Sequence, residues 1–256
     1  MRWTRRLLYV TSLATLLVFP YGPLFPWSPM RPGYDTLQLA RADVVYPSGV
    51  LVDPAYLDLD KFIMEAEKFH ALAMPKRVTV VACRDWADFH RFVPQIRGQA
   101  VAAVTIQTGT AIFVTPKIAE KHLDVAEFLR HELSHAALHQ NQGLIDAYRI
   151  EQQQWFCEGL AVLFGHQRSY ISAAEFRERT QETELFPLFT GPQSDMRFGY
   201  QAWRYFLDYW IQTRGRESFL KLEKRCISAP LDCAADRKEI EDFQTAVRTG
   251  TYIPRD

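Results

Sequence analysis

The chain has 256 residues, with 30 basic and 30 acidic side chains and a formal net charge of zero. A mixed surface without a basic excess gives no reason to expect a nucleic-acid or polyanion partner. The bias to 22 arginines over 8 lysines, with a single asparagine, is typical of a GC-rich genome and suggests a bacterial source.

The N-terminus predicts export. Arg2, Arg5 and Arg6 precede an apolar run from Leu7 to Phe19, and uncharged sequence continues to Met30. We interpret residues 1–30 as a signal peptide or signal anchor with the arginines on the cytoplasmic side. Because no A-x-A-like cleavage site follows the run, an anchor is favoured. The expected location is the bacterial cell envelope, with a single inner-membrane span and an extracytoplasmic domain, or the periplasm or exterior if the segment is cleaved.

The following residues predict an α+β fold. Residues 31–56 contain several prolines and are expected to be a linker. Residues 57–256 are long enough for one domain with its own core. Hydrophobic periodicity and turn residues predict the first elements of that domain. They are helices over 59–73 and 85–93, a buried strand over 77–83, and strands over 101–106 and 111–115 that form a hairpin around Thr108 and Gly109.

A long helix is expected next, because Asp124 can cap it and no proline or glycine follows until Gly143. This helix contains the letters H-E-L-S-H, from His131 to His135. Residues four apart lie on one helix face, so the two imidazoles can bind one Zn²⁺ ion. Glu132 lies beside them and can reach a water molecule next to the metal.

A catalytic zinc site usually has three protein ligands. His139 lies on the same helix face but about 12 Å from His131 along the axis, too far to share a metal with bonds near 2 Å. The metzincin pattern requires a glycine and a histidine where this chain has Leu138 and Asn141, so that class is excluded. The remaining candidate is Glu158, within the W-F-C-E-G-L-A stretch of a second predicted helix.

These two motifs, separated by 22 residues, resemble the gluzincin (peptidase MA-like) metallohydrolases, over roughly residues 78 to 222. The resemblance implies that Glu158 is the third zinc ligand. It also implies a zincin-like fold, in which a small mixed β-sheet is followed by the H-E-x-x-H helix and a mostly helical C-terminal half. The strand just before that helix, residues 111–115, would be the sheet edge that pairs with an extended peptide substrate. Thermolysin-type members place a histidine-orienting aspartate where this chain has Val162, so such a partner must come from elsewhere.

The expected chemistry is peptide-bond hydrolysis. Zinc would lower the pKa of a water molecule and polarise the scissile carbonyl, while Glu132 accepts the water proton and passes it to the leaving amine. A further donor should stabilise the oxyanion. By resemblance Tyr200 is the candidate and His166 the second choice, although most tyrosines only cover the edge of a core.

Four cysteines in an exported chain suggest disulfide bonds. Cys226 and Cys233 flank a short loop and form a natural local pair. Three possibilities remain for Cys83 and Cys157: a disulfide bond between them, two buried free thiols, or a cysteine that binds a metal. The other predicted elements are helices over 173–184, 200–213, 217–227 and 237–248, and His70, His90, His122 and His139 are expected at the surface or at helix caps.

We therefore predict a membrane-anchored or exported zinc peptidase of the gluzincin type. Its expected partners are a peptide or protein substrate and, through the N-terminal segment, a membrane. Two alternatives remain: a catalytically silent zincin-fold module that binds a cell-envelope partner, and a metal-free structural domain in which H-E-L-S-H occurs by chance.

Overall fold

The computed structural model describes residues 19–167, 170–191 and 195–255. The described chain forms two compact units. The first unit comprises the described part of residues 1–60 together with 76–106 and 110–125, and the second comprises 61–75, 107–109 and the described part of 126–256. The apolar run of the predicted signal segment lies, up to residue 18, outside the described residues. Within the described residues, no helix has the length and apolar character needed to cross a bilayer.

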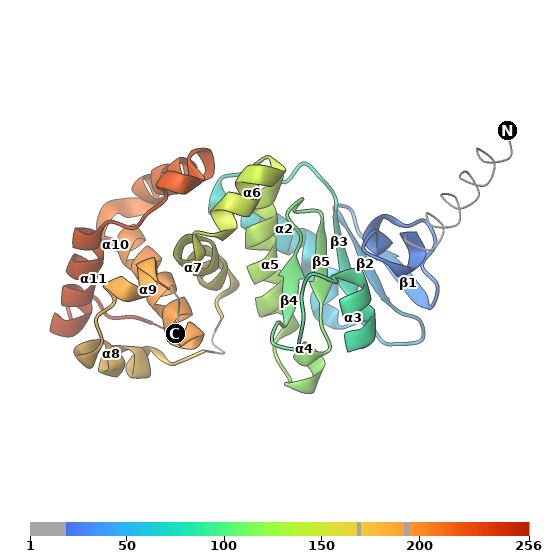
Figure 1. Cartoon of the computed structure of the whole chain (residues 1–256), viewed down its shortest axis with the longest axis horizontal. Helices are drawn as coiled ribbons and strands as arrows, with labels where there is room; N and C mark the ends of the chain where they lie inside the picture. The colour runs from blue at the N-terminus through green and yellow to red at the C-terminus, as the bar shows by residue number, and fades with distance from the viewer. Residues whose placement is uncertain (1–18, 168–169, 192–194, 256) are drawn as a thin grey trace, which may run out of the picture. The chain divides into compact units, whose positions relative to one another are not determined.

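A mixed five-stranded sheet organises the first unit, with the strand order β1-β2-β3-β5-β4 (Figure 1). Strands β2, β3 and β5 run parallel, whereas β1 and β4 are antiparallel to their neighbours. The strands are β1 (Tyr34–Gln38), β2 (Ala42–Pro47), β3 (Val78–Ala82), β4 (Ala103–Thr105) and β5 (Ala111–Val114). The short helices of the unit are η1 (Phe25–Trp27), η2 (Pro54–Asp58), α3 (Trp86–Phe92) and α4 (Lys117–Glu120). The predicted buried strand corresponds to β3, whose β-branched run suits a strand flanked by parallel neighbours.

The segment predicted as a linker belongs to this sheet. Residues 31–56 contain β1 and β2, and β2 pairs with β3 through Val44 opposite Val80. Val44 and Val45 are fully buried. The linker prediction is wrong here because the prolines lie outside the strand interiors, with Pro47 as the last residue of β2. Phe25 is also buried, with its ring 4.2 Å from that of Phe92, so the folded unit begins before the predicted boundary at residue 30.

The strand before the H-E-x-x-H helix is not an edge of the sheet. Strand β5 lies between β3 and β4, with Val80 opposite Ile112 on one side and Thr105 opposite Ile112 on the other. Both of its sides are therefore occupied, and the expectation that residues 111–115 pair with a substrate is wrong. The predicted hairpin is present, since β4 and β5 are antiparallel and Gly109 between them adopts a positive φ of 65°. The turn places the short strand β4 at the edge.

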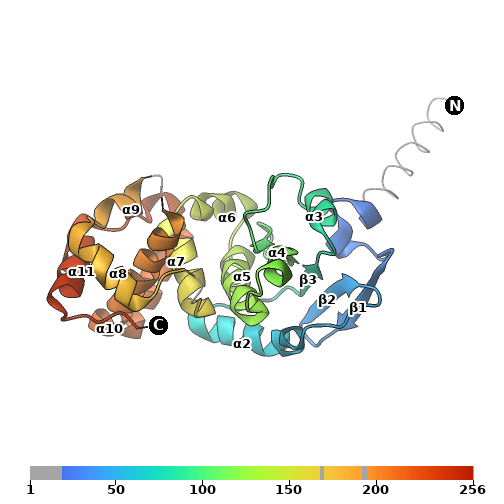
Figure 2. The ribbon, with the colours of Figure 1, turned by 90° about the horizontal axis from the view of Figure 1, so that it is seen from below.

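The second unit is helical, and its helices α8 to α11 lie together on one side of α7 in both views (Figures 1 and 2). Apart from their first residues, α2 (Leu59–His70) and α5 (Val125–Gln140) belong to it. The other helices are α6 (Leu144–Glu151), α7 (Gln154–Gly165), α8 (Ala173–Glu182), α9 (Phe186–Thr190), α10 (Met196–Ser228), η3 (Pro230–Asp232) and α11 (Arg237–Thr249). Gly215 interrupts α10 with non-helical dihedral angles, which accounts for the two separate helices predicted there. The predicted small mixed sheet and mostly helical second half are confirmed.

The core of the second unit is rich in aromatic residues and centres on α7 and α10. Trp155 and Phe206 are buried in it with their rings 5.9 Å apart. Helix α7 lies so close to α10 that a Cβ on Gly159 would come within 3.0 Å of Leu207 and Trp203. The glycine of the E-G-L-A motif is therefore needed for helix packing, and this packing fixes the position of the neighbouring Glu158.

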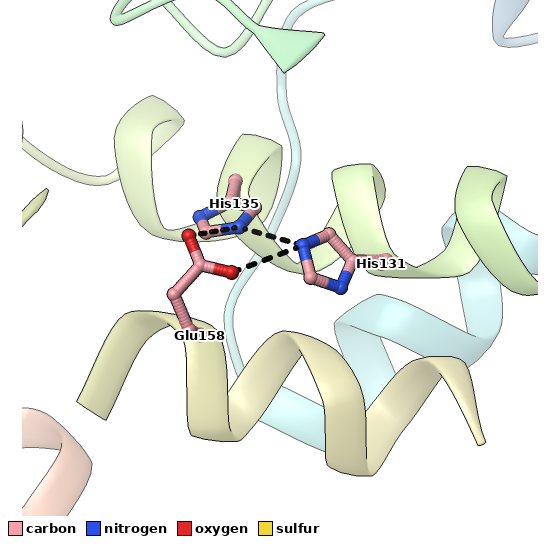
Figure 3. Close-up of side chains that lie close together, drawn as sticks. All are labelled: His131, His135 and Glu158. Carbon is pink, nitrogen blue, oxygen red and sulfur yellow. Dashed lines mark hydrogen bonds and ion pairs between the residues drawn. The ribbon is translucent and has the colours of Figure 1, made fainter. Parts of the chain in front are cut away.

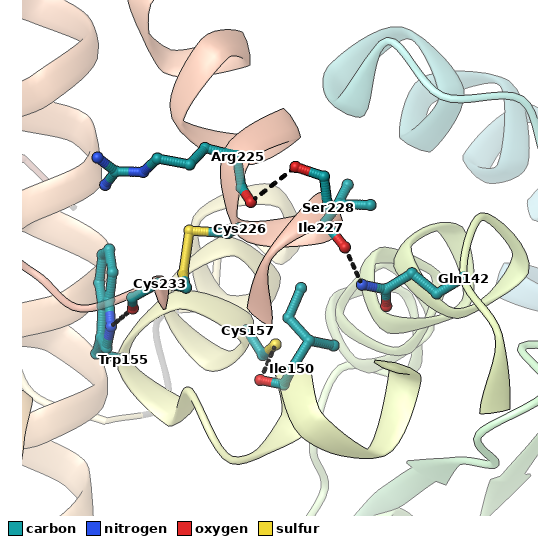
Figure 4. The surroundings of a disulfide bond; sticks show 9 residues. All are labelled: Gln142, Ile150, Trp155, Cys157, Arg225, Cys226, Ile227, Ser228 and Cys233. Atoms are coloured by element: carbon teal, nitrogen blue, oxygen red, sulfur yellow. Dashed lines mark hydrogen bonds between the residues drawn. A yellow bond between two sulfur atoms is a disulfide. The ribbon is translucent and has the colours of Figure 1, made fainter. Parts of the chain in front are cut away.

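A disulfide bond joins Cys226 on α10 to Cys233 after η3, as predicted (Figure 4). The indole nitrogen of Trp155 donates a hydrogen bond of 3.0 Å to the carbonyl of Cys233. Cys83 and Cys157 are both buried free thiols, so they form no second bridge. Instead, the Cys157 thiol donates to the carbonyl of Ile150, 3.1 Å away, and ties the start of α7 to the end of α6.

Candidate metal centre

Helix α5 carries His131 and His135 one turn apart, on a stretch that is almost completely buried. The exposed fractions are 7% for His131, 5% for Glu132 and 5% for His135. Buried imidazole and carboxylate groups are costly unless they are paired or bind a metal. The H-E-L-S-H segment therefore requires partners from the rest of the unit.

Glu158 of α7 faces the two histidines, and the three side chains point toward one another (Figure 3). The Nε2 atoms of His131 and His135 are 3.3 Å apart. The Glu158 carboxylate lies 3.4 Å from His131 Nε2 through Oε2 and 3.8 Å from His135 Nε2 through Oε1. The structure thus brings together the three residues that the sequence singled out as metal ligands.

The spacing of these atoms fits a tetrahedral zinc ion. Two ligand atoms that are each about 2.1 Å from zinc, at a tetrahedral angle, lie about 3.4 Å from each other. The donor set of two imidazoles and one carboxylate is also one that catalytic zinc sites use, with a fourth position left for water. The residues present therefore fit the metal that the motif implies.

Hydrogen bonds at the far side of each ring direct both Nε2 atoms inward. His131 Nδ1 lies 2.9 Å from Oε1 of Gln167, and His135 Nδ1 lies 3.1 Å from Oε1 of Glu151. An oxygen acceptor at Nδ1 fixes the proton there and leaves the Nε2 lone pair free for a metal. Gln167 and Glu151 thus orient the two histidine rings, a role that the apolar side chain of Val162 cannot fill.

The carboxylates of the site favour a positive charge at its centre. Burial lowers the pKa of His135, but the charge and hydrogen bond of Glu151, with the charges of Glu158 and Glu132, outweigh it and raise that pKa to about 10. Burial raises the pKa of Glu158, yet the hydrogen bond from His131 and the charges of both histidines lower it below the usual value. Both shifts favour a positive charge beside the Glu158 carboxylate.

The candidates for the oxyanion donor are placed differently. Burial raises the pKa of Tyr200, and the charges of Glu158 and Glu132 and a hydrogen bond with Glu158 raise it further, so its hydroxyl stays protonated beside the cluster. His166 is exposed and forms the left-handed C-cap of α7, with φ 51°. Sequence reasoning missed Tyr170, whose ring lies 5.0 Å from that of Tyr200 and whose hydroxyl is 3.2 Å from Gln167 Oε1.

Two histidines expected at the surface are buried. His139 is 2% exposed and its Nε2 lies 2.7 Å from Glu151 Oε1. His70 is 2% exposed and its Nδ1 is paired with the buried carboxylate of Glu223. Neither is therefore at the surface, although both lie in the last turn of their helices, as the alternative of a helix-cap position allows. Their partners lie 12 and 153 residues away in the chain, and no spacing rule indicates them.

No protein-family model matches this sequence, and no curated protein matches it either. The fold is similar to solved structures of M1 zinc metallopeptidases. One is a two-domain M1 zinc metallopeptidase, solved as a mutant bound to L-tryptophan, with 14% identity, a TM-score of 0.47, and coverage of 86% of this chain and 51% of that one. Another is the M1 zinc metallopeptidase from Deinococcus radiodurans, with 13% identity, a TM-score of 0.46, and coverage of 86% and 52%. The chain spans about half the length of these structures, and the likeness concerns the fold alone.

Zinc binding should release a proton, because His135 must lose the proton that its raised pKa of about 10 retains. Below pH 10 that proton competes with the metal, so the apparent zinc affinity should rise with pH, by about tenfold per unit for one proton. Calorimetric titration of the metal-free protein between pH 6 and 8.5, in buffers that differ in ionisation enthalpy, measures both quantities. A zinc affinity that does not change over this range would contradict the assignment of His135 as a protonated ligand.

Proposed function

We propose that this protein is a zinc-dependent peptidase of the gluzincin type, with His131, His135 and Glu158 as the metal ligands. The observation that carries the proposal is the convergence of the two Nε2 atoms and the Glu158 carboxylate within 3.8 Å, each Nε2 freed by a hydrogen bond at Nδ1. Two inward lone pairs and a carboxylate repel one another unless a cation lies between them. When bound, zinc would polarise the substrate carbonyl and lower the pKa of a water molecule.

Glu132 is the proposed general base. It follows His131 on α5 and is 5% exposed, so its carboxylate is shielded from bulk water. Its charge raises the pKa of His135, Tyr170 and Tyr200, which supports its assignment to the same cluster. A carboxylate there can accept the proton of the attacking water and deliver it to the leaving nitrogen.

Tyr200 is the proposed oxyanion donor. Its hydroxyl keeps its proton because burial and the carboxylates around it raise its pKa. A neutral phenol beside Glu158 can donate a hydrogen bond to charge that develops on the substrate oxygen.

The Glu132→Gln variant tests the chemistry. Glutamine keeps the size of the side chain but cannot accept the proton, so hydrolysis should fall by about 10²- to 10⁴-fold while zinc content stays at the wild-type level. The measurement compares turnover of a fluorescently quenched casein and of a panel of aminoacyl-nitroanilides with zinc content from the same samples. Glu178→Gln, the same change at an exposed position of α8, is the control and should keep full activity.

The other possible results distinguish the peptidase from the two alternative functions. Full activity in Glu132→Gln would show that this residue is not the base. Zinc binding without any hydrolysis by the wild type would support a silent binding module, and absence of zinc would support a chance motif.

The proposed site of action is outside the cytoplasm, at the cell envelope. The disulfide between Cys226 and Cys233 supports this, because such bonds persist in oxidising compartments. The arginines at positions 2, 5 and 6 would keep the N-terminus in the cytoplasm while the rest of the chain crosses.

Reporter fusions at the C-terminus test this location. Alkaline phosphatase, which works only after export, should be active there, and a fluorescent protein that matures only in the cytoplasm should stay dark. The reverse pair of results would contradict extracytoplasmic action and predict that Cys226 and Cys233 are reduced in the cell.

A further inference from the structure

We propose that Glu151, held in place by His139, is a positioning residue that orients His135 and strengthens its bond to the metal. This proposal rests on the proposed zinc site. It adds how the ring of His135 is oriented toward the metal. It assigns a role to the third histidine of the α5 face, which is too far along the helix to bind the same ion.

A single oxygen of Glu151 serves both rings. Oε1 lies 3.1 Å from His135 Nδ1 and 2.7 Å from His139 Nε2. The two rings are one helical turn apart on α5, with centroids 6.2 Å apart. His139 thus adds a second donor that fixes where the carboxylate points, and the carboxylate in turn fixes the ring of His135.

Helix α6 is placed to deliver this carboxylate. It begins at Leu144, after Gly143 in extended conformation, and Glu151 is its last residue. The carbonyl of Ile150 accepts hydrogen bonds from the Cys157 thiol and from the amide of Gln153. Helix η3, next to the Cys226–Cys233 disulfide, packs against α6. The end of α6 is therefore fastened to the start of α7 by the hydrogen bond between Cys157 and Ile150 (Figure 4).

The two metal-facing histidines have unlike partners. The acceptor for His131 is the neutral amide of Gln167, whereas the acceptor for His135 is a carboxylate. A carboxylate makes the ring a stronger electron donor than an amide does, and orienting partners of this kind change metal affinity by about 10- to 100-fold. We therefore expect His135 to depend on its partner more than His131 does.

A second metal ion offers another reading of the same atoms, because His135, His139 and Glu151 bring ligand atoms within 4.8 Å of one another. In that arrangement His135 would bind two cations through its two ring nitrogens and would have to lose its last ring proton. Glu151 would be the only carboxylate of the second group to offset the added charge. The positioning role requires neither and uses the ring in its ordinary neutral form.

Three variants of the full chain test the proposal. Glu151→Gln keeps the shape of the side chain and removes its charge, and zinc affinity should fall by about 10- to 100-fold. His139→Gln exchanges the rigid ring donor to Glu151 for a flexible amide and should reduce affinity less, by about two- to tenfold, at most the value of one hydrogen bond. Asp146→Asn removes the same charge from a half-exposed site on α6, where the carboxylate pairs with Arg149, and should leave affinity unchanged.

Zinc affinity is measured by competition with a chromogenic chelator, and the number of zinc ions per chain by elemental analysis. The visible spectrum after replacement of zinc by Co²⁺ reports the geometry at the metal. The spectrum should change in Glu151→Gln and stay constant in Asp146→Asn. Thermal unfolding of each metal-free variant shows whether the fold is kept.

The outcomes separate this proposal from the function on which it rests. One zinc ion in the wild type and unchanged affinity and spectrum in Glu151→Gln would overturn the positioning role and leave the zinc site intact. Two ions in the wild type, with one lost in His139→Gln, would replace the positioning role by a second metal site. A wild-type chain that binds no zinc would overturn both proposals.

Discussion

The structure depends on the placement of three electron-rich atoms from two helices at one point. The Nε2 atoms of His131 and His135 and the carboxylate of Glu158 lie 3.3 to 3.8 Å apart in a mostly buried setting. Such a group is unfavourable by itself, because its members have lost water without gaining a positive partner. A divalent cation between these atoms would satisfy it.

The close approach of α5 and α7 makes this placement possible, and two glycines of α7 permit it. A Cβ on Gly165 would lie 3.0 Å from the carbonyl oxygen of Glu127 and 3.3 Å from the amide nitrogen of His131. Gly159 allows the same closeness to α10 on the opposite side of the ligand Glu158. Helix α7 is thus fixed between two helices, which sets the distance from Glu158 to the histidines.

The candidate site was predictable to the extent that its residues are close in sequence or belong to a recurrent motif. The helical spacing of His131 and His135 and the acidic residue in W-F-C-E-G-L-A led to residues that lie together. The orienting residues were not predictable in this way. Glu151 and Gln167 reach the histidines only because α6 and the end of α7 return to α5, and this return is a tertiary property.

The fold was likewise predictable where it depends on neighbouring residues, and not where it depends on contacts between distant parts of the chain. Regular runs such as the one in β3 and the hairpin of β4 and β5 were recognisable because their pattern is local. The role of residues 31–56 was not recognisable from the sequence. A segment with prolines near its strand ends resembles a linker until the pairing of β2 with β3 is known. The position of β5 inside the sheet likewise depends on the later antiparallel pairing with β4, which no periodicity reveals.

The most direct test of the central claim is the position of the metal itself. Crystals grown with zinc, measured on both sides of the zinc absorption edge, should show one anomalous peak between α5 and α7. This peak should lie about 2.0–2.2 Å from Nε2 of His131, Nε2 of His135 and an oxygen of Glu158. A peak elsewhere, or ligand side chains that remain without metal at saturating zinc, would contradict it.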